Sequence, residues 1–183
     1  MTSARRPARG RLAEAAAALP ALLGLTCLGA AAIACGPPPA PRTANDADLR
    51  SVPEGRALAI AREALADAGF QAGPGFAVDI GREAPLEVDL RVADTRFGVE
   101  WVSAQDRADL GDQLPPPAPG GELRILPGVG EDAAIEVLLL HAESYRYDPD
   151  RERVQRGATG AADVEARLRR DLRDFLGYCR AQL

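Results

Sequence analysis

The chain has 183 residues, a formal net charge of −5 and a single histidine, and all 22 of its basic residues are arginines. The absence of lysine excludes the usual phosphate-binding loops and the enzymes that form a Schiff base, because both need an ε-amino group. The acidic balance disfavours nucleic-acid binding, which depends on neutralising phosphates, so no nucleic-acid partner is expected.

Residues 1–34 have the organisation of a secretory signal peptide. Four arginines lie within the first eleven residues, and residues 12–34 are mostly alanine and leucine. A basic segment followed by an apolar one is typical of export signals. The apolar run ends in Ala-Ile-Ala-Cys-Gly at residues 32–36, where the small residues before Cys35 suit cleavage by a signal peptidase.

The sequence around Cys35 resembles the lipobox of bacterial lipoproteins, although Ala32 stands where leucine is commonest. The resemblance covers only the N-terminus. It implies acylation of Cys35, a lipid anchor in a membrane and an extracytoplasmic place in the cell envelope. Because Gly36 is not the aspartate that commonly signals inner-membrane retention, the outer membrane is favoured. Loss of the signal would leave a mature net charge of about −8, since four arginines and one glutamate leave with it.

Two alternatives to lipidation stay open at this point. Residues 15–35 approach the roughly 20 residues that a membrane-spanning helix needs, so an uncleaved anchor is one alternative. The other is cleavage by ordinary signal peptidase and release of the chain. A free Cys35 could then form a disulfide with Cys179 in an oxidising compartment.

The mature chain divides into a tether and one domain. Residues 36–50 contain three consecutive prolines and no apolar periodicity, which predicts an extended segment. We therefore expect a lipidated, proline-rich tether over residues 35–50. A single globular domain is expected over residues 51–183.

The first predicted helix of this domain has recognisable ends. Ser51 and Glu54 form the pattern of a capping box, and Pro53 falls in the first turn. Gly69 is expected to end the helix in the left-handed conformation, with Phe70 folding back onto the apolar face.

Alternating apolar residues predict strands at residues 76–80, 88–92 and 97–101, and the last two should pair as a hairpin. Ser103 is then expected to cap a short helix over residues 104–110.

The second half of the domain contains two more strands and a long helix. A strand is expected at residues 123–126, and the apolar run at residues 135–141 predicts a central strand buried on both faces. Asp148-Pro149-Asp150-Arg151 has the pattern of a type I turn, so residues 153–156 should return as a short strand. Residues 162–182 predict a helix with an apolar stripe from Val164 to Leu183.

These elements predict an α+β fold. We expect a small antiparallel or mixed sheet of four to six strands packed against the N-terminal and C-terminal helices.

Few residues of the sequence suggest a catalytic or metal-binding site. His141 is interpreted as a structural histidine, because no second metal-type ligand is spaced to join it. Asp89 and Glu100 are expected to face outward on neighbouring strands as a solvated pair. A hairpin with these two carboxylates is similar to the core of restriction nucleases, but Val102 stands where those enzymes need a lysine.

Two further patterns are rejected as sites. Asp148, Asp150 and Glu152 start like a calcium loop, but Arg153 occupies the position where that loop requires glycine. Cys179 falls on the apolar face of a helix, where a thiol is usually inert. No catalytic residue, metal or cofactor is expected.

The leading functional hypothesis is therefore a membrane-anchored, non-catalytic binding or scaffold protein of the cell envelope, acting on a protein partner. Aromatic residues and arginine are enriched at interface anchors, which selects Trp101, Tyr145, Tyr147 and Arg151 as the candidate partner-binding surface. The alternative is a small hydrolase or ligand-binding domain with a site near Glu100, Trp101, His141 and Tyr145.

Overall fold

The computed structural model describes residues 45–118 and 122–183. The predicted signal peptide, Cys35 and residues 36–44 of the predicted tether lie outside the described residues. Within the two described ranges, no helix is long and apolar enough to cross a membrane. The domain has the predicted α+β architecture, with a five-stranded mixed sheet and two long helices that pack together.

The central sheet has the strand order β2-β5-β6-β8-β7. Strands β6 and β8 are parallel, and the other neighbouring pairs are antiparallel. The predicted hairpin is confirmed as β5–β6, with Asp94 at a φ of 59° between the two strands. The strands are β2 (Ala72–Gly73), β5 (Leu90–Val92), β6 (Phe97–Val102), β8 (Glu136–His141) and β7 (Arg124–Pro127).

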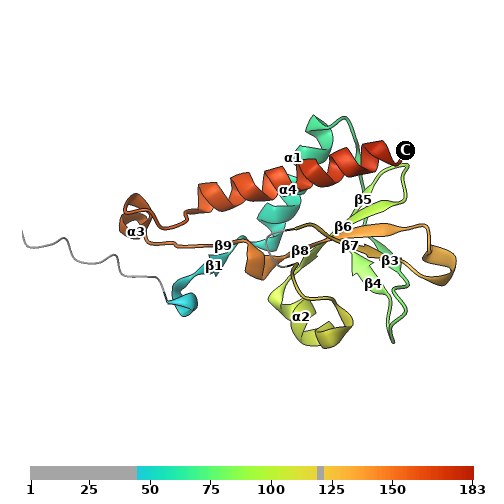
Figure 1. The fold of residues 1–183 in the computed structure, drawn as a ribbon, viewed down its shortest axis with the longest axis horizontal. Helices are drawn as coiled ribbons and strands as arrows, with labels where there is room; N and C mark the ends of the chain where they lie inside the picture. Colours follow the sequence, from blue (N-terminus) through green and yellow to red (C-terminus); the bar gives the residue numbers. More distant parts are fainter. Residues whose placement is uncertain (1–44, 119–121) are drawn as a thin grey trace, which may run out of the picture. The chain divides into compact units, whose positions relative to one another are not determined.

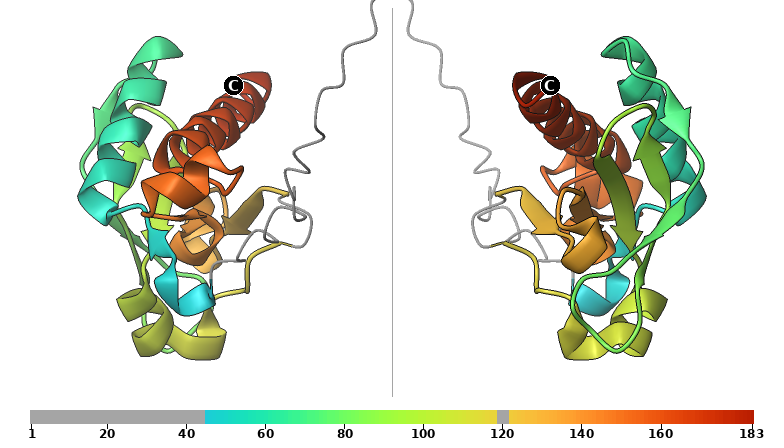
Figure 2. Two further views of the ribbon diagram at one scale, coloured as in Figure 1. Left: turned by 90° about the vertical axis from the view of Figure 1, so that its left-hand side faces the viewer. Right: turned by 90° about the vertical axis from the view of Figure 1, so that its right-hand side faces the viewer.

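Two helices, α1 (Glu54–Asp67) and α4 (Ala161–Ala181), cover one face of this sheet, as Figures 1 and 2 show. The apolar stripe predicted for the last helix is confirmed, because Leu168, Leu172 and Phe175 are fully buried. Phe175 meets Phe97 of β6 edge to face, with 6.1 Å between ring centroids. Leu183, which the stripe also placed in the core, lies beyond the helix and is exposed.

The other face of the sheet is covered by smaller elements. The run expected as one strand over residues 88–92 is interrupted at Asp89, so that β4 pairs with β3 while β5 stays in the central sheet. A second apolar cluster on this face includes Val78, Leu86, Val102 and Leu139. Because both faces are covered, all six residues of β6 are buried. The covering elements are β3 (Phe76–Val78), β4 (Leu86–Val88) and α2 (Ala104–Leu110).

The start of α1 corrects a prediction. Ser51 does not cap the helix but belongs to β1 (Arg50–Ser51), which pairs with β9 (Arg146–Tyr147). The N-cap is Pro53, and no side chain caps the helix there. The backbone N–H of Val52 donates to the Tyr145 carbonyl at 3.1 Å. This ladder holds the chain extended through Ser51 and removes it from the capping position.

The end of α1 agrees with the prediction. Gly69 has a φ of 79°, and the N–H of Phe70 donates to the carbonyl of Leu65 at 2.9 Å. This is the reversed bonding of a Schellman motif, which satisfies carbonyls that the helix leaves unpaired. Ser103 also caps α2 as expected, and Asp106 completes a capping box with it.

Residues 148–156 do not form the expected turn and return strand. They lead into a short helix, α3 (Arg151–Gln155), because the Asp150 side chain accepts hydrogen bonds from the N–H groups of Glu152 and Arg153. The buried Asp148 carboxylate fixes the entry to this helix, accepting from Arg153 Nε at 2.6 Å. Short 3₁₀ helices are η1 (Asp46–Asp48), η2 (Gly111–Gln113), η4 (Gly130–Asp132) and η5 (Ala142–Ser144).

Candidate functional site

The sheet separates the four residues of the predicted ligand site. Side chains alternate along a strand, so Glu100 lies on the face opposite Trp101, and His141 lies on the face opposite Leu140. Trp101 and Tyr145 meet in the core between the sheet and the long helices, with ring centroids 5.5 Å apart. The four residues therefore do not form one site: Glu100 is separated from Trp101 by the sheet, and only His141 and Tyr145 come near each other, past the end of β8.

The predicted partner-binding residues are also divided. Trp101 is 2 % exposed and Tyr145 is 5 % exposed, so both belong to the core. Tyr147 is half-buried and packs against that core, and Arg151 is exposed at the start of α3. Of the four, Arg151 is the residue whose side chain is available to a partner at the surface without repacking.

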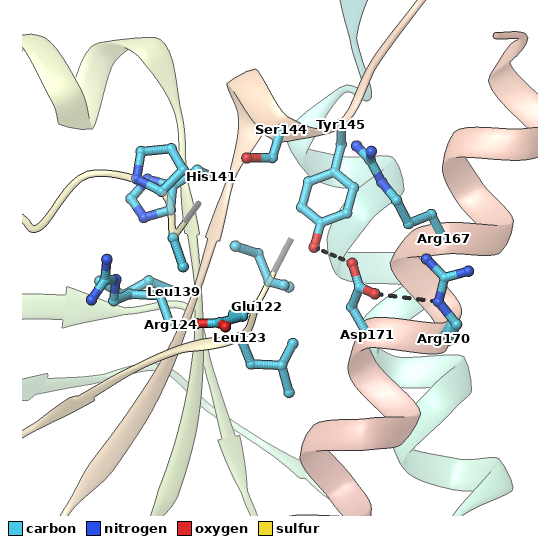
Figure 3. A pocket seen from close by; sticks show the side chains of 13 residues that line it. Glu122, Leu123, Arg124, Leu139, His141, Ser144, Tyr145, Arg167, Arg170 and Asp171 are labelled. Carbon is cyan, nitrogen blue, oxygen red and sulfur yellow. Dashed lines mark hydrogen bonds and ion pairs between the residues drawn. The ribbon is translucent and has the colours of Figure 1, made fainter. Parts of the chain in front are cut away.

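A cavity of about 410 Å³ lies between the end of β8 and α4, and we name it the β8–α4 cavity. It exists because β7 is shorter than β8. Their pairing ends at Arg124 and Leu139, so the last two residues of β8 have no partner strand on that side. His141 and Tyr145 both line this cavity, together with Arg124, Arg167, Arg170 and Asp171 (Figure 3).

The α4 wall of the cavity is a connected polar group. The Tyr145 hydroxyl donates to Asp171 Oδ2 at 2.9 Å, and Arg170 Nε lies 3.7 Å from Asp171 Oδ1. The guanidinium of Arg167 lies over the Tyr145 ring, 5.1 Å from its centroid. Burial and the neighbouring Asp171 raise the pKa of Tyr145, so this phenol stays protonated and remains a donor.

The opposite wall contains His141, which is 3 % exposed. Its Nδ1 lies 2.8 Å from Arg107 Nη2, and Arg107 also donates to the Leu114 carbonyl at 3.1 Å. Burial and the positive charges of Arg107 and Arg124 lower the pKa of His141 to about 4. The imidazole is therefore neutral at physiological pH, and Arg107 fixes its orientation.

The Asp89 and Glu100 pair is not the solvated pair that the sequence predicted. The N–H of Asp89 donates to Glu100 Oε2 at 3.0 Å, and the N–H of Trp101 donates to Asp89 Oδ2 at 2.8 Å. Glu100 is 4 % exposed, and its burial beside Asp89 raises its pKa to about 9. The prediction was wrong because the small β3–β4 sheet covers the face that was expected to be open.

Several polar residues of the β8–α4 cavity were not singled out in the sequence. Arg167, Arg170 and Asp171 fall outside the apolar stripe that was predicted for the last helix, and Arg124 belongs to no motif. Their common feature is position beside the end of β8, where β7 no longer pairs with it. No local pattern marks that position, because it depends on where β7 stops and on how α4 crosses the sheet.

The described parts of the chain offer little for metal binding or for thiol reactions. No group of three or more His, Cys, Asp or Glu residues there could hold a metal ion. Cys179 is fully buried, and burial raises the pKa of its thiol to about 12. A disulfide from Cys179 to Cys35 would require opening of the core.

Comparisons of the chain with protein-family models, with curated proteins and with solved structures found no match. A functional conclusion therefore depends on the N-terminal motif and on the geometry of the domain.

Proposed function

We propose that this protein is an exported lipoprotein of the cell envelope, anchored through Cys35, whose domain binds a partner without catalysing a reaction. The observation that supports this location is the Ala-Ile-Ala-Cys-Gly sequence at residues 32–36, which follows a basic segment and an apolar segment. The outer membrane is the favoured membrane, because Gly36 is not an inner-membrane retention residue.

The arrangement of polar groups in the domain supports a binding role. A serine nucleophile needs a neighbouring base, but His141 makes no hydrogen bond with Ser144 and instead accepts one from Arg107. Glu100, with its raised pKa, is a neutral acid at physiological pH, and it lies on the face of the sheet opposite Tyr145. These states suit recognition by fixed donors better than acid–base or nucleophilic catalysis.

The anchor is tested by the intact mass and the fractionation of the native protein. The expected mature species begins at Cys35, carries acyl chains and requires detergent for extraction. Cys35→Ala should abolish the lipid mass and release the chain from the membrane fraction. Cys27→Ala is the matched control, because Cys27 belongs to the predicted signal and its loss should change neither result.

Two results would contradict a lipid anchor at Cys35. A Cys35→Ala protein that keeps its mass and still fractionates with membranes would identify the apolar segment as an uncleaved anchor. A wild-type protein that is cleaved, unacylated and soluble would identify ordinary secretion.

A further inference from the structure

The segment through which the chain enters the domain lies on the surface and is mostly exposed. It comprises η1 and β1 and ends at Val52, and we name residues 46–52 the N-terminal strap. Val52 is 3 % exposed and is the one buried residue of the strap. Leu49 is half-buried, and the remaining strap residues are exposed. The strap stops at Pro53, the N-cap of α1, from which the chain is held by the helix.

The strap is attached to the domain along β9. Its strand β1 pairs with β9 over two residues, as Figure 1 shows. The N–H of Val52 extends this pairing by donating to the Tyr145 carbonyl at 3.1 Å. A pairing of only two strands is marginally stable at best. The attachment of the strap therefore depends on its side chains as well.

Two ion pairs supply side-chain contacts to the strap. Arg146 Nη1 lies 3.6 Å from Asp46 Oδ1, and Arg146 also donates to the Asp46 carbonyl. Arg153 Nη1 lies 3.7 Å from Asp48 Oδ2. The Asp46 side chain is 93 % exposed and that of Asp48 is 49 % exposed. Exposed ion pairs contribute little to stability and are screened by salt, so the strap upstream of Val52 is held by contacts that break readily.

The strap also forms one wall of a pocket of about 530 Å³. The pocket lies at the C-terminal ends of β6 and β8, which are the parallel pair of the sheet. Ser51 and Val52 line it from the strap, Trp101 from β6 and Arg107 from α2, and all of its lining residues are described. Open α/β sheets bind ligands in crevices outside such strand ends. With the strap in place, Trp101 is only 2 % exposed.

We propose that the N-terminal strap is a releasable cover, which detaches from β9 as one unit while the rest of the domain stays folded. Its release removes one wall of the pocket at the ends of β6 and β8 and exposes Trp101. Segments with few buried contacts open locally at a lower free energy than the whole domain. Because residue 45 continues into the predicted tether, a load on the tether acts on η1 before it reaches Val52. The proposal rests on the proposed anchor for this trigger, but not for the release itself.

Native-state hydrogen exchange of the full-length chain tests the release. We expect the N–H of Val52 to exchange through a local opening that urea hardly accelerates, and faster than the N–H groups of β6 and β8. The double variant Asp46→Asn/Asp48→Asn should accelerate this exchange by about fivefold or more. About 1 M sodium chloride should have a similar effect on the wild type. Glu152→Gln is the matched control, because it removes an exposed ion pair with Arg156 outside the strap.

The single tryptophan of the chain provides a second measurement. Val52→Ala removes two methyl groups from the buried residue of the strap, so it should raise the population with a released strap by about tenfold. Acrylamide should then quench the fluorescence of Trp101 more strongly. Val92→Ala, in the same apolar cluster but on β5, is the matched control. It should lower the stability of the whole domain and leave the quenching of the folded protein unchanged.

Four results would overturn the proposal. The first two are exchange of Val52 only by global unfolding, and exchange that the double aspartate variant does not accelerate. The others are equal acceleration by Glu152→Gln, and equal quenching of Trp101 in the Val52→Ala and Val92→Ala proteins. Failure of the anchor would appear in the mass and the fractionation of the wild type, which do not depend on the strap. Failure of the anchor and failure of the strap are therefore distinguishable.

Discussion

The backbone N–H of Asp89, at the junction between β4 and β5, donates a hydrogen bond to the side chain of Glu100 in β6 at 3.0 Å. The Asp89 carboxylate accepts in turn from the N–H of Trp101. Burial raises the pKa of both carboxyl groups, and it raises that of Glu100 to about 9. The pair is therefore held with a proton on Glu100 at neutral pH.

This proton makes stability depend on pH. In the unfolded chain Glu100 loses its proton near 4.5, the ordinary pKa of a glutamate side chain, whereas in the folded chain it keeps the proton to about pH 9. The folded state thus binds more protons between these two values, so the free energy of unfolding should fall as the pH rises from about 4.5 to 9. The expected slope is up to about 1.4 kcal/mol per pH unit, the value for one bound proton.

The Glu100→Gln variant should remove most of this slope, because its amide imitates the protonated acid and does not titrate. Urea denaturation at several pH values between 5 and 9 measures the slope. Glu87→Gln on the exposed side of β4 is the control and should keep the wild-type slope. An unchanged slope in Glu100→Gln would show that the carboxyl is ionised in the folded state.

At acid pH, His141 should make the free energy of unfolding depend on pH in the opposite direction. Its pKa is lowered from 6.5 to about 4 in the folded domain, mainly by burial. Between these values the unfolded state binds the extra proton, so stability should fall as the pH drops from about 6.5 to 4. His141→Gln should lower stability at pH 7 by about 1 to 3 kcal/mol and lose this acid-side slope. Denaturation curves that keep the slope would assign it to another group.

Tyr145 should contribute through its hydroxyl as well as its ring. Tyr145→Phe keeps the ring against Trp101 but removes the 2.9 Å bond to Asp171. We expect a loss of about 1 kcal/mol in the free energy of unfolding. Tyr147→Phe is the matched control, because no hydrogen bond of its hydroxyl is seen among the described residues. Equal losses in both variants would indicate that the Asp171 bond is not a net stabilising contact.

The predicted protein-partner surface now depends chiefly on Arg151. Arg151→Ala should change the free energy of unfolding by less than about 0.5 kcal/mol, because the side chain is exposed. Under the partner hypothesis, this variant should lose capture of envelope proteins in a pull-down from native membranes. Arg173→Ala on α4 controls for the loss of one positive charge. Retention of every wild-type partner by Arg151→Ala would remove this surface from consideration.

Tyr147→Ala separates packing from recognition at the same place. Its ring is half-buried against the core, so we expect it to lower the melting temperature, in contrast to Arg151→Ala. A Tyr147→Ala protein with an unchanged melting temperature that lost its partners would restore Tyr147 as an interface anchor.

The sequence pattern correctly predicted the elements that are specified by residues close together in the chain. The three-four spacing from Val164 to Cys179 identified α4 and its buried face, Gly69 marked the end of α1, and Ser103 marked the start of α2. Alternation identified the β5–β6 hairpin, and the continuous apolar run identified β8. These features depend on the period of one helix or strand, or on one cap, so nearby residues are sufficient to specify them.

The errors arose where a distant segment competes with a local pattern. Ser51 and Glu54 form a capping box by spacing, but pairing of β1 with β9 brings residues nearly a hundred positions away to this segment. Glu100 looks like an outward residue of a half-exposed hairpin, but the β3–β4 sheet covers it. In each case the free energy of tertiary pairing or burial outweighs a local preference of about 1 kcal/mol.

By itself the sequence determined the fold class, the two long helices, the main-sheet strands β5, β6, β7 and β8 but not β2, and the motif at Cys35 on which the anchor proposal depends. Only the tertiary structure decided the β8–α4 cavity, because the arginines that line it come from β7 and α4, and they share it with His141 only because β7 stops short of the end of β8. Helical or strand periodicity reports which face of one element is apolar. It contains no information about which polar side chains from separate elements share a cavity.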